Sequence, residues 1–419
     1  MDKFLIRGGN RLEGEVAISG MKNSALPIIF GTICAADVCV IENLPDVSDI
    51  SLSLETLRSV GAKIRFINTS SVMIDTTEVT MKRPPLEYVS KIRGSTYLLG
   101  AMLGRFGKAQ IGTPGGCDFG TRPIDLHIKG FEALGAKTSY EDNASISFST
   151  PNGLHGNLFY LNIASVGATI NIMLAAVFAK GITVIENAAR EPHVVDTACF
   201  LNACGAKIFG AGTNMIRIEG VEKLHGCTYS IAPDMIEAGT FMVAAAATRG
   251  RVTLKNVIPK HLDSVTQNLI KIGAKVEQGS NTITVSGEGK FNSVEINTCT
   301  YPGFPTDMHP QFSALLCLAE TGMSKVCEGI WKGRFKYTEE LKKMGAEIQV
   351  ADTTAHIYPT GKLTGAEVKA SDLRAGACLV IAGLCAEGQT TISGVEYIDR
   401  GYEHFVEKLR SLGADIKRI

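Results

Sequence analysis

The sequence predicts an α/β fold of six repeated units, grouped into two three-unit domains with helices inside and sheets around them. Three observations predict it. A Gly-Ala dipeptide recurs six times at nearly even spacing, each unit contains one wholly apolar helix and one amphipathic helix, and short β-branched strands lie between the helices.

The repeat is visible in the positions of the dipeptide alone. Each Gly-Ala follows an amphipathic segment, and the six copies begin at Gly61, Gly135, Gly205, Gly273, Gly345 and Gly413. Successive copies are 74, 70, 68, 72 and 68 residues apart. Intervals this similar are not expected by chance, even in a chain with 44 glycines, so we treat the repeat as real.

The first helix of each unit is expected to be buried, because small and apolar residues cover almost its whole circumference. A helix without a polar face has no side to present to water. These helices are predicted over residues 23–35, 94–103, 166–179, 236–247, 310–319 and 375–386.

The second helix of each unit is amphipathic and ends at the repeated glycine. In the first copy, Ile50, Leu54 and Leu57 fall at positions i, i+4 and i+7 of a predicted helix over 49–60. The glycine then suits the left-handed residue that ends many helices. Strands are predicted between the two helices at 38–42, 183–186, 252–256 and 390–393, and after the glycine at 63–67, 275–277 and 347–350.

Six units could form one ring or two groups of three. Residues 230–234 join the third and fourth units and resemble a hinge. We therefore favour two domains that meet at a cleft, which is a common place for a ligand site.

The composition excludes several classes of function. The chain has 419 residues with 42 basic and 42 acidic side chains, so a general nucleic-acid or membrane-surface role gains no support. Its first residues lack the apolar core of a signal peptide, and its longest apolar stretches are about half of what a bilayer requires. We expect a soluble, cytoplasmic protein.

The cysteines and histidines point to neither a disulfide framework nor a metal site. Eleven cysteines occur without a CxxC pair, and eight histidines occur without HxH or HExxH spacing. We expect a reducing compartment. Six cysteines are expected to be small core residues, namely Cys34, Cys39, Cys204, Cys317, Cys378 and Cys385.

Charged residues at the starts of the buried helices need a reason. Lys22, Arg93 and Arg374 lie where the helix dipole already favours an anion, so they could complete a receptor for phosphate or carboxylate groups. The alternative is pairing with nearby acids, notably Asp372 beside Arg374.

A second informative segment is the glycine- and proline-rich loop IGTPGGCDFGTRPIDL at 111–126, which should expose Cys117 close to Arg122. A free thiol on a surface loop is the alternative. Asp307 could be only a helix N-cap. Arg334 and Arg400 could be surface residues, and His127 is expected to be a surface or capping group.

At these residues the sequence resembles the UDP-N-acetylglucosamine 1-carboxyvinyltransferase family of enolpyruvyl transferases. The resemblance covers essentially the whole chain. It rests on LIRGGNRLEGEVAISGMKNSALP, TPGGCDFGTRPIDLHIKG, SVGATINIMLAAV, YPGFPTDMHPQF, RFKYTEELKKMGA, DLRAGACLVIAGL and YIDRGYEH. It implies two similar domains of three βαβαββ-like repeats around buried helices, an inside-out α/β barrel, with the active site in the interdomain cleft. The domains would be 22–231, and 1–21 together with 232–419.

The resemblance also implies the reaction: transfer of the enolpyruvyl group of phosphoenolpyruvate to the 3-hydroxyl of the nucleotide sugar, with release of phosphate. Cys117 would be the proton donor and the residue that the antibiotic fosfomycin modifies, and Asp307 the base. Phosphoenolpyruvate would contact Lys22, Asn23, Arg122 and Arg400, with Arg334 and Arg374 near its anionic groups. The nucleotide sugar would contact Arg93, Arg122, Pro123, Ile124, Asp125, Leu126, Ile163, Ala164, Ser165, Val166, Asp307 and Ile330. Some relatives have lysine where Ile163 stands.

Two other readings of the sequence remain open. The shikimate 3-phosphate enolpyruvyl transferases share the double three-repeat fold but lack the loop cysteine. A non-catalytic repeat protein that binds anions would need neither Cys117 nor Asp307. Nothing in the sequence demands a metal or an organic cofactor.

Overall fold

The computed structural model describes residues 2–112, 124–141 and 145–419, and these residues form two compact units. The central unit consists of the described residues between 20 and 232. The terminal unit combines residues 2–19 with 233–419, so both ends of the chain belong to it. No helix in the described part of the chain is long and apolar enough to span a membrane.

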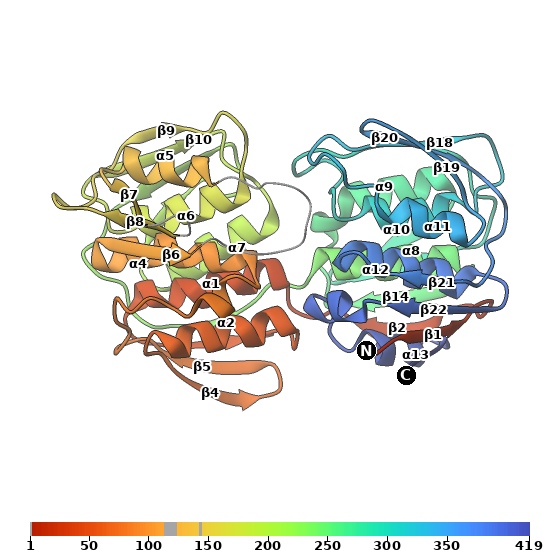
Figure 1. The fold of residues 1–419 in the computed structure, drawn as a ribbon, viewed down its shortest axis with the longest axis horizontal. Coiled ribbons are helices and arrows are strands. Elements are labelled where there is room, and N and C mark those ends of the chain that lie inside the picture. Colours follow the sequence, from red (N-terminus) through yellow and green to blue (C-terminus); the bar gives the residue numbers. More distant parts are fainter. Residues whose placement is uncertain (1, 113–123, 142–144) are drawn as a thin grey trace. The chain divides into compact units, whose positions relative to one another are not determined.

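Three buried helices pack against one another inside the central unit (Figure 1). They are α1 (Lys22–Ala35), α4 (Tyr97–Phe106) and α6 (Val166–Ala176), and α4 is preceded by a 3-10 turn, η1 (Arg93–Thr96). From Ser24 to Ala35 every residue of α1 is buried. These are the first helices of the first three repeats, and the prediction that they form the core is confirmed.

Outer helices and sheets surround these three helices. The helices are α2 (Ser48–Ser59), α3 (Leu86–Val89), α5 (Asp125–Ala133) and α7 (Pro192–Ala203). One sheet has the order β13 (Thr228–Ser230), β3 (Val38–Glu42), β5 (Ser71–Asp75), β4 (Lys63–Asn68). A second has the order β9 (Leu158–Tyr160), β10 (Ile182–Glu186), β12 (Met215–Glu219), β11 (Lys207–Phe209), and a third the order β6 (Lys108–Gly112), β8 (Ser145–Ser149), β7 (Lys137–Glu141).

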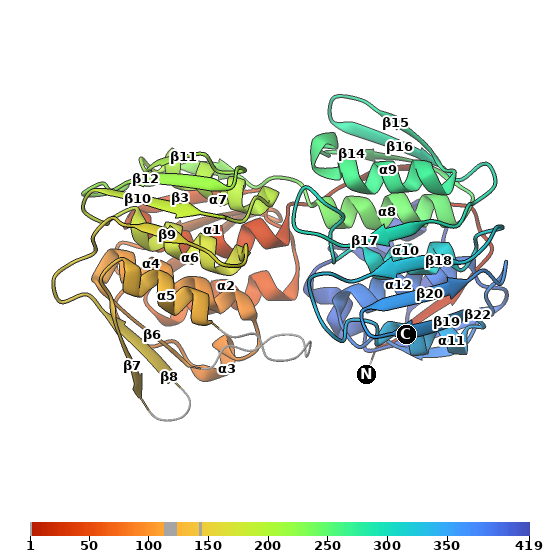
Figure 2. The same ribbon diagram turned by 90° about the horizontal axis from the view of Figure 1, so that it is seen from above.

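The terminal unit repeats this plan. Its inner helices are α8 (Met235–Ala247), α10 (His309–Leu316) and α12 (Leu373–Cys385), which contact one another. Its outer helices are η3 (Pro259–Leu262), α9 (Asp263–Ile272), α11 (Tyr337–Lys343), η4 (Val395–Arg400) and α13 (Phe405–Ser411). Figure 2 shows α8 beneath α9 and the hairpin of β15 (Lys275–Gln278) and β16 (Thr282–Ser286).

The sheets of the terminal unit each have four strands. Their orders are β15-β16-β14 (Arg251–Lys255)-β2 (Glu13–Ala17), then β17 (Glu295–Asn297)-β18 (Ser324–Cys327)-β20 (Thr354–Tyr358)-β19 (Glu347–Ala351), and β21 (Glu367–Lys369)-β22 (Gln389–Ser393)-β1 (Phe4–Arg7)-β23 (Asp415–Arg418). In each, one parallel pair is extended by antiparallel strands, as in β21, β22 and β1. This is the βαβαββ order that the family resemblance implies.

The amino terminus completes the terminal unit rather than the central one. Strand β1 inserts between β22 and β23, and β2 pairs in parallel with β14. In the central unit β13, which comes last in that unit's sequence, supplies the parallel partner of β3. The chain therefore closes each ring of three repeats with a strand from a distant part of the sequence.

The repeated glycines behave as predicted. All six have φ between +88° and +116°, the left-handed range that ends a helix, and a strand begins two residues after each of them. The helix predicted over 94–103 is the main correction: residues 93–96 form a 3-10 turn and the α-helix begins at Tyr97.

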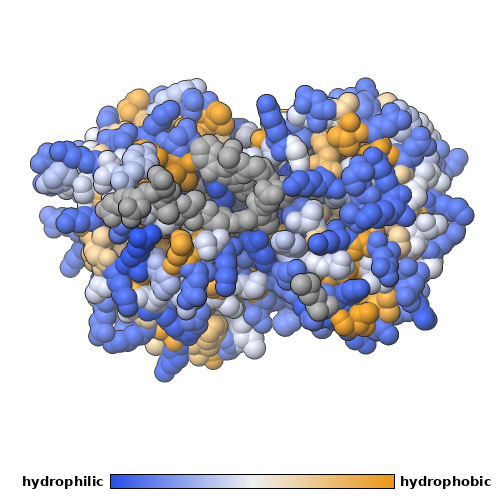
Figure 3. Space-filling model, in the orientation of Figure 1, coloured by the Kyte–Doolittle hydropathy of each residue, from blue (hydrophilic) through white to orange (hydrophobic). Residues whose placement is uncertain are grey.

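The apolar residues are concentrated inside. The face in Figure 3 is mostly hydrophilic with scattered small apolar areas. Five of the six cysteines expected in the core are buried, and Cys385 is partly exposed.

Candidate active site

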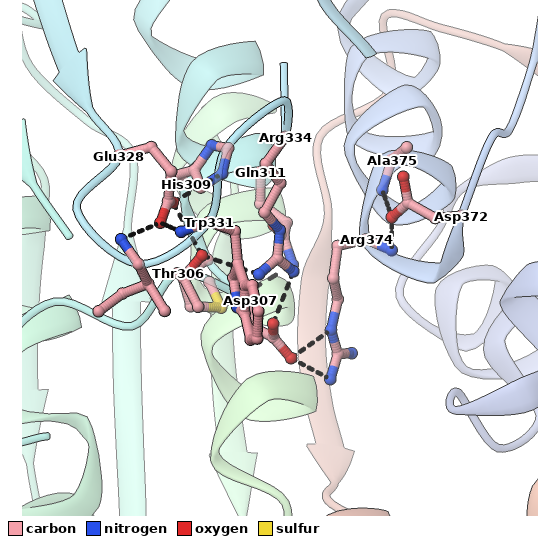
Figure 4. A network of polar contacts seen from close by, with 12 residues as sticks. Thr306, Asp307, His309, Gln311, Glu328, Trp331, Arg334, Asp372, Arg374 and Ala375 are labelled. Carbon is pink, nitrogen blue, oxygen red and sulfur yellow. Dashed lines mark hydrogen bonds and ion pairs between the residues drawn. The ribbon is translucent and has the colours of Figure 1, made fainter. Parts of the chain in front are cut away.

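Asp307 lies between two arginines in the terminal unit (Figure 4). It stands just before α10, Arg334 just before α11, and Arg374 in the first turn of α12. The Nη2 of Arg334 is 2.6 Å from Oδ1 of Asp307, and the Nε and Nη2 of Arg374 are each 3.0 Å from Oδ2. Each carboxylate oxygen is therefore held by a different guanidinium group.

The two arginines are nearly buried, with side chains 5% and 7% exposed, whereas the Asp307 side chain is 28% exposed. Burial by itself would raise the pKa of Asp307, but the charges of Arg374 and Arg334 outweigh it and hold this pKa well below its usual range. The alternative in which Asp307 is an N-cap is wrong, since Met308 occupies the N-cap position of α10. The alternative in which Arg334 is a surface residue is also wrong, because this residue is buried.

A second acid, Glu328, is connected through Thr306 to Arg334, one of the two arginines that hold Asp307. The buried Glu328 accepts hydrogen bonds from the backbone N–H groups of Ile330 and Trp331 at 2.7 and 2.9 Å, and from the Thr306 hydroxyl at 2.8 Å. The same hydroxyl accepts from Nη1 of Arg334 at 2.7 Å. Glu328 thus fixes both the loop that carries Ile330 and, through Thr306, the orientation of Arg334.

Arg374 is oriented by its own helix. The Asp372 side chain accepts from the backbone N–H groups of Arg374 and Ala375 at 2.9 and 3.0 Å, so it caps α12. The alternative in which Arg374 pairs with an acid is therefore correct, but its partner is Asp307 and not Asp372. The Arg374 guanidinium turns to Asp307 and lies 5.6 Å from the centre of the Tyr402 ring. Arg400 is the last residue of η4 and is partly exposed.

In the central unit, Lys22 and Asn23 begin α1, and both are partly exposed. The Nζ of Lys22 is 2.6 Å from Oδ2 of Asp49 on α2. No side-chain cap hydrogen bond forms at the α1 N-terminus, where the helix dipole favours an anion. The pairing alternative is correct for Lys22, and its position at a helix start also suits phosphate.

A third group of predicted residues surrounds the start of α6. Ser165 caps this helix by accepting from the Ala168 N–H at 3.4 Å, and Val166 is its first residue. Arg93 begins η1, whereas Ile163 is 67% exposed. The remaining members of the group are Ile124, Asp125 and Leu126 at the start of α5, and Ala164 before α6.

His127 is buried beside these residues, not on the surface as the sequence suggested. It is 4% exposed, and its Nε2 lies 2.9 Å from the position that a Cβ on Gly167 would take. Burial, reinforced by the charge of Arg93, lowers the pKa of His127 to about 4, so the imidazole is neutral at physiological pH. A larger residue at 167 would require the His127 ring to shift.

Comparisons with known proteins identify the family of the chain. The family model described as EPSP synthase (3-phosphoshikimate 1-carboxyvinyltransferase) matches residues 6–409. A protein of Clostridium botulinum (strain ATCC 19397 / Type A) named UDP-N-acetylglucosamine 1-carboxyvinyltransferase is 53% identical, with 100% of both chains covered. One of Geobacillus kaustophilus (strain HTA426), named UDP-N-acetylglucosamine 1-carboxyvinyltransferase 2, is 51% identical over 100% of this chain and 97% of its own.

The chain belongs to the UDP-N-acetylglucosamine 1-carboxyvinyltransferase family. The fold agrees with this: the solved enolpyruvyl transferase NikO from Streptomyces tendae has a TM-score of 0.90 at 26% identity, covering 100% of this chain and 98% of its own. An EPSP synthase from Acinetobacter baumannii has a TM-score of 0.76 at 21% identity over 100% of both chains, which supports the fold alone.

Some of the site residues that the resemblance to the UDP-N-acetylglucosamine 1-carboxyvinyltransferase family implies have no described position. Cys117, Arg122 and Pro123 lie outside the described residues. Conversely, sequence reasoning missed Glu328 and Thr306. Thr306 directly precedes Asp307 in a quoted motif, but a lone glutamate such as Glu328 carries no local signal of its burial.

Proposed function

We propose that this protein transfers the enolpyruvyl group of phosphoenolpyruvate to the 3-hydroxyl of UDP-N-acetylglucosamine and releases phosphate, the first committed step of peptidoglycan synthesis. The observation that carries the proposal is the family membership: relatives with that name are 50–53% identical over the full chain. The arginine-bound Asp307 supplies the polar chemistry that such a reaction requires.

The reaction is an addition followed by an elimination. The sugar oxygen bonds to C2 of phosphoenolpyruvate while its proton passes to a base and the methylene carbon gains a proton from an acid. Loss of phosphate and of a methyl proton then restores the double bond. We assign the base to Asp307, whose carboxylate is the partly exposed member of its buried cluster.

The low pKa of Asp307 would make it a weak base while both arginines hold it. The carboxylate and phosphate of phosphoenolpyruvate compete for guanidinium groups, which bind either anion through two hydrogen bonds. We assign Arg334 and Arg374 to these substrate anions. Their transfer from Asp307 to the substrate would raise the pKa of Asp307 when it is needed as a base.

The remaining assignments follow the family motifs. Phosphoenolpyruvate is held by Lys22, Asn23, Arg122 and Arg400, and the nucleotide sugar by Arg93, the segments 122–126 and 163–166, Asp307 and Ile330. We propose that the chain has two domains, one formed by residues 22–231 and the other by residues 1–21 together with 232–419. A cytoplasmic location is proposed because eleven cysteines, an odd number, fit a reducing compartment.

Cys117 is proposed as the proton donor and the site of covalent modification by fosfomycin. Nearby arginines favour the thiolate, whereas bound substrate anions favour the protonated thiol that a donor requires. The variant Cys117→Asp can still carry a proton but cannot form the thioether. It should retain activity and resist fosfomycin; loss of activity in this variant, with the fold intact, would contradict the donor role.

The test of the function is phosphate release from phosphoenolpyruvate with each of two acceptors. We expect release with UDP-N-acetylglucosamine and none above background with shikimate 3-phosphate. Release only with the second acceptor would favour the shikimate-type activity, and release with neither would favour an anion-binding protein.

A further inference from the structure

Three cysteine side chains converge in the central unit, away from the residues assigned to the reaction. The sulfur atoms of Cys39, Cys204 and Cys227 all lie within 4.8 Å of one another, and those of Cys204 and Cys227 are 3.4 Å apart. Cys39 and Cys204 are 0% and 1% exposed, whereas Cys227 is partly exposed. It is the only such group of potential ligands among the residues that the structure describes.

Three different elements bring the thiols together. Cys39 lies on β3, Cys204 is the C-cap of α7, and Cys227 directly precedes β13. The backbone N–H of Val40 donates to the carbonyl oxygen of Cys227 at 2.9 Å, and the N–H of His225 donates to that of Cys204 at 2.9 Å. The cluster therefore sits where the first repeat, the third repeat and the closing strand meet.

The turn before Cys227 is shaped for a close approach. A Cβ on Gly226 would lie only 1.9 Å from the carbonyl oxygen of Val38, so only glycine lets this turn contact β3. The Asp37 carboxylate accepts from the N–H groups of both Val38 and Gly226, at 2.8 and 2.9 Å. One side chain thereby ties together the segments that carry Cys39 and Cys227.

We propose that Cys39, Cys204 and Cys227 form a site for Zn²⁺, held by three thiolates with a fourth position open to solvent beside Cys227. Thiolate sulfurs are soft ligands that favour this ion among the common divalent cations. In a tetrahedral site with Zn–S bonds of about 2.3 Å, the sulfurs are about 3.8 Å apart. The Cys204–Cys227 separation of 3.4 Å is slightly shorter than that value, and no two of the three sulfurs are more than 4.8 Å apart. Changes of about 1 Å or less in the sulfur–sulfur distances would therefore suffice.

The same thiols allow two competing outcomes. Cys204 and Cys227 could form a disulfide under an oxidant, which would leave Cys39 alone. Alternatively, the three could be small core residues with no ligand, as the sequence suggested for Cys39 and Cys204. Three thiols from separate elements converge around one point, two of them buried and the third, Cys227, partly exposed, which distinguishes a ligand set from scattered core cysteines.

The test uses the reduced, metal-free full chain carrying Cys117→Ser, so that the loop thiol does not contribute. Titration with Co²⁺ should give the sulfur-to-metal charge-transfer absorption and intense visible bands of tetrahedral thiolate coordination, and Zn²⁺ should bleach them at one equivalent per chain. Cys227→Ser should lower the Zn²⁺ affinity by at least about a hundredfold, more than the loss of an outer-shell partner costs. Cys39→Ser should have the same effect.

Cys199→Ser is the matched control, because Cys199 is an exposed thiol on α7, the helix that ends at Cys204. It should leave the Zn²⁺ affinity unchanged. The proposal is overturned if Co²⁺ gives no thiolate bands, if Cys227→Ser binds Zn²⁺ as tightly as its parent, or if all three thiols react with a thiol reagent equally fast with and without Zn²⁺. Because none of these readouts is the transferase activity, the result is independent of the proposed function.

Discussion

Asp307 is a residue whose neighbours determine its chemistry. Two guanidinium groups hold its carboxylate, and both come from parts of the chain at least 27 residues away. The same aspartate at an ordinary helix start would only cap the helix. Its low pKa and its proposed role as a base both depend on the positions of the Arg334 and Arg374 guanidinium groups.

We expect Asp307→Asn to reduce kcat by roughly 10²- to 10⁴-fold, because an amide cannot accept the sugar proton. It also leaves two buried arginines without a counter-charge, which should cost about 3–5 kcal/mol of stability. Steady-state kinetics and thermal unfolding separate the two effects.

Thr306→Val provides the control for that experiment, since it removes hydrogen bonds to Arg334 and Glu328 without removing a proton acceptor. It should lose stability but retain kcat within about tenfold. A kcat for Asp307→Asn equal to that of the control would exclude Asp307 as the base.

His127 should make the stability of the central unit depend on pH. Its pKa is about 4 in the folded protein and 6.5 ordinarily, so between these values the unfolded chain binds more protons. The free energy of unfolding therefore has its full value, as far as His127 is concerned, above pH 6.5. It falls by up to roughly 3 kcal/mol as the pH decreases toward 4.

His127→Gln should remove that part of the pH dependence. Denaturant unfolding at a series of pH values would measure it, with a shallower slope between pH 4 and 6.5 expected for the variant. Identical slopes in the two proteins would mean that burial does not lower the pKa of His127.

At the scale of elements, two separate factors favour glycine at the ends of the outer helices: the positive φ and, at some positions, a lack of space for a Cβ atom. Gly413 has a φ of +98°, and the nearest atom to a Cβ placed there is the Arg11 carbonyl oxygen at 3.5 Å. Gly273 has a φ of +116°, and a Cβ there would lie 2.2 Å from the carbonyl oxygen of Lys290. Both glycines belong to the terminal unit, so they can be compared directly.

Gly413→Ala should destabilise the terminal unit by about 1–2 kcal/mol, the cost of the left-handed conformation alone. Gly273→Ala should cost clearly more, because a backbone oxygen must also move. Chemical denaturation of the two variants tests this order. Equal losses would show that the Lys290 segment yields without cost.

At the scale of the whole molecule, the two units differ in how the chain supplies them. The central unit is one continuous segment, whereas the terminal unit needs β1 and β2 from the first residues. Without them, β22 and β23 lose the strand between them, and β14 loses its parallel partner.

Residues 20–232 should therefore fold when expressed alone, and residues 233–419 should not. The backbone groups of Lys3 and Ile419 exchange two hydrogen bonds of 2.9 Å, so a short linker can join the two ends (Figure 1). A permuted chain that runs from 233 to 419, through the linker, and on to residues 1–19 should recover the fold. Circular dichroism and cooperative unfolding would show it, and a folded 233–419 fragment would contradict the argument.

The sequence by itself determined the repeat, the buried helices and the glycines that end their partners. These features depend on periodicity and on local conformational preference, which a short segment expresses without its neighbours. The long motifs also placed Asp307, Arg334 and Arg374 in one functional set.

Only the tertiary structure decided how such residues are used. It buried His127, made Asp372 a helix cap, linked Glu328 to Arg334 through Thr306, and gathered Cys39, Cys204 and Cys227 although 23 to 188 residues separate them in the chain. Contacts of this kind depend on which distant elements pack together. Packing of distant elements leaves no periodic signal at the residues that it brings into contact.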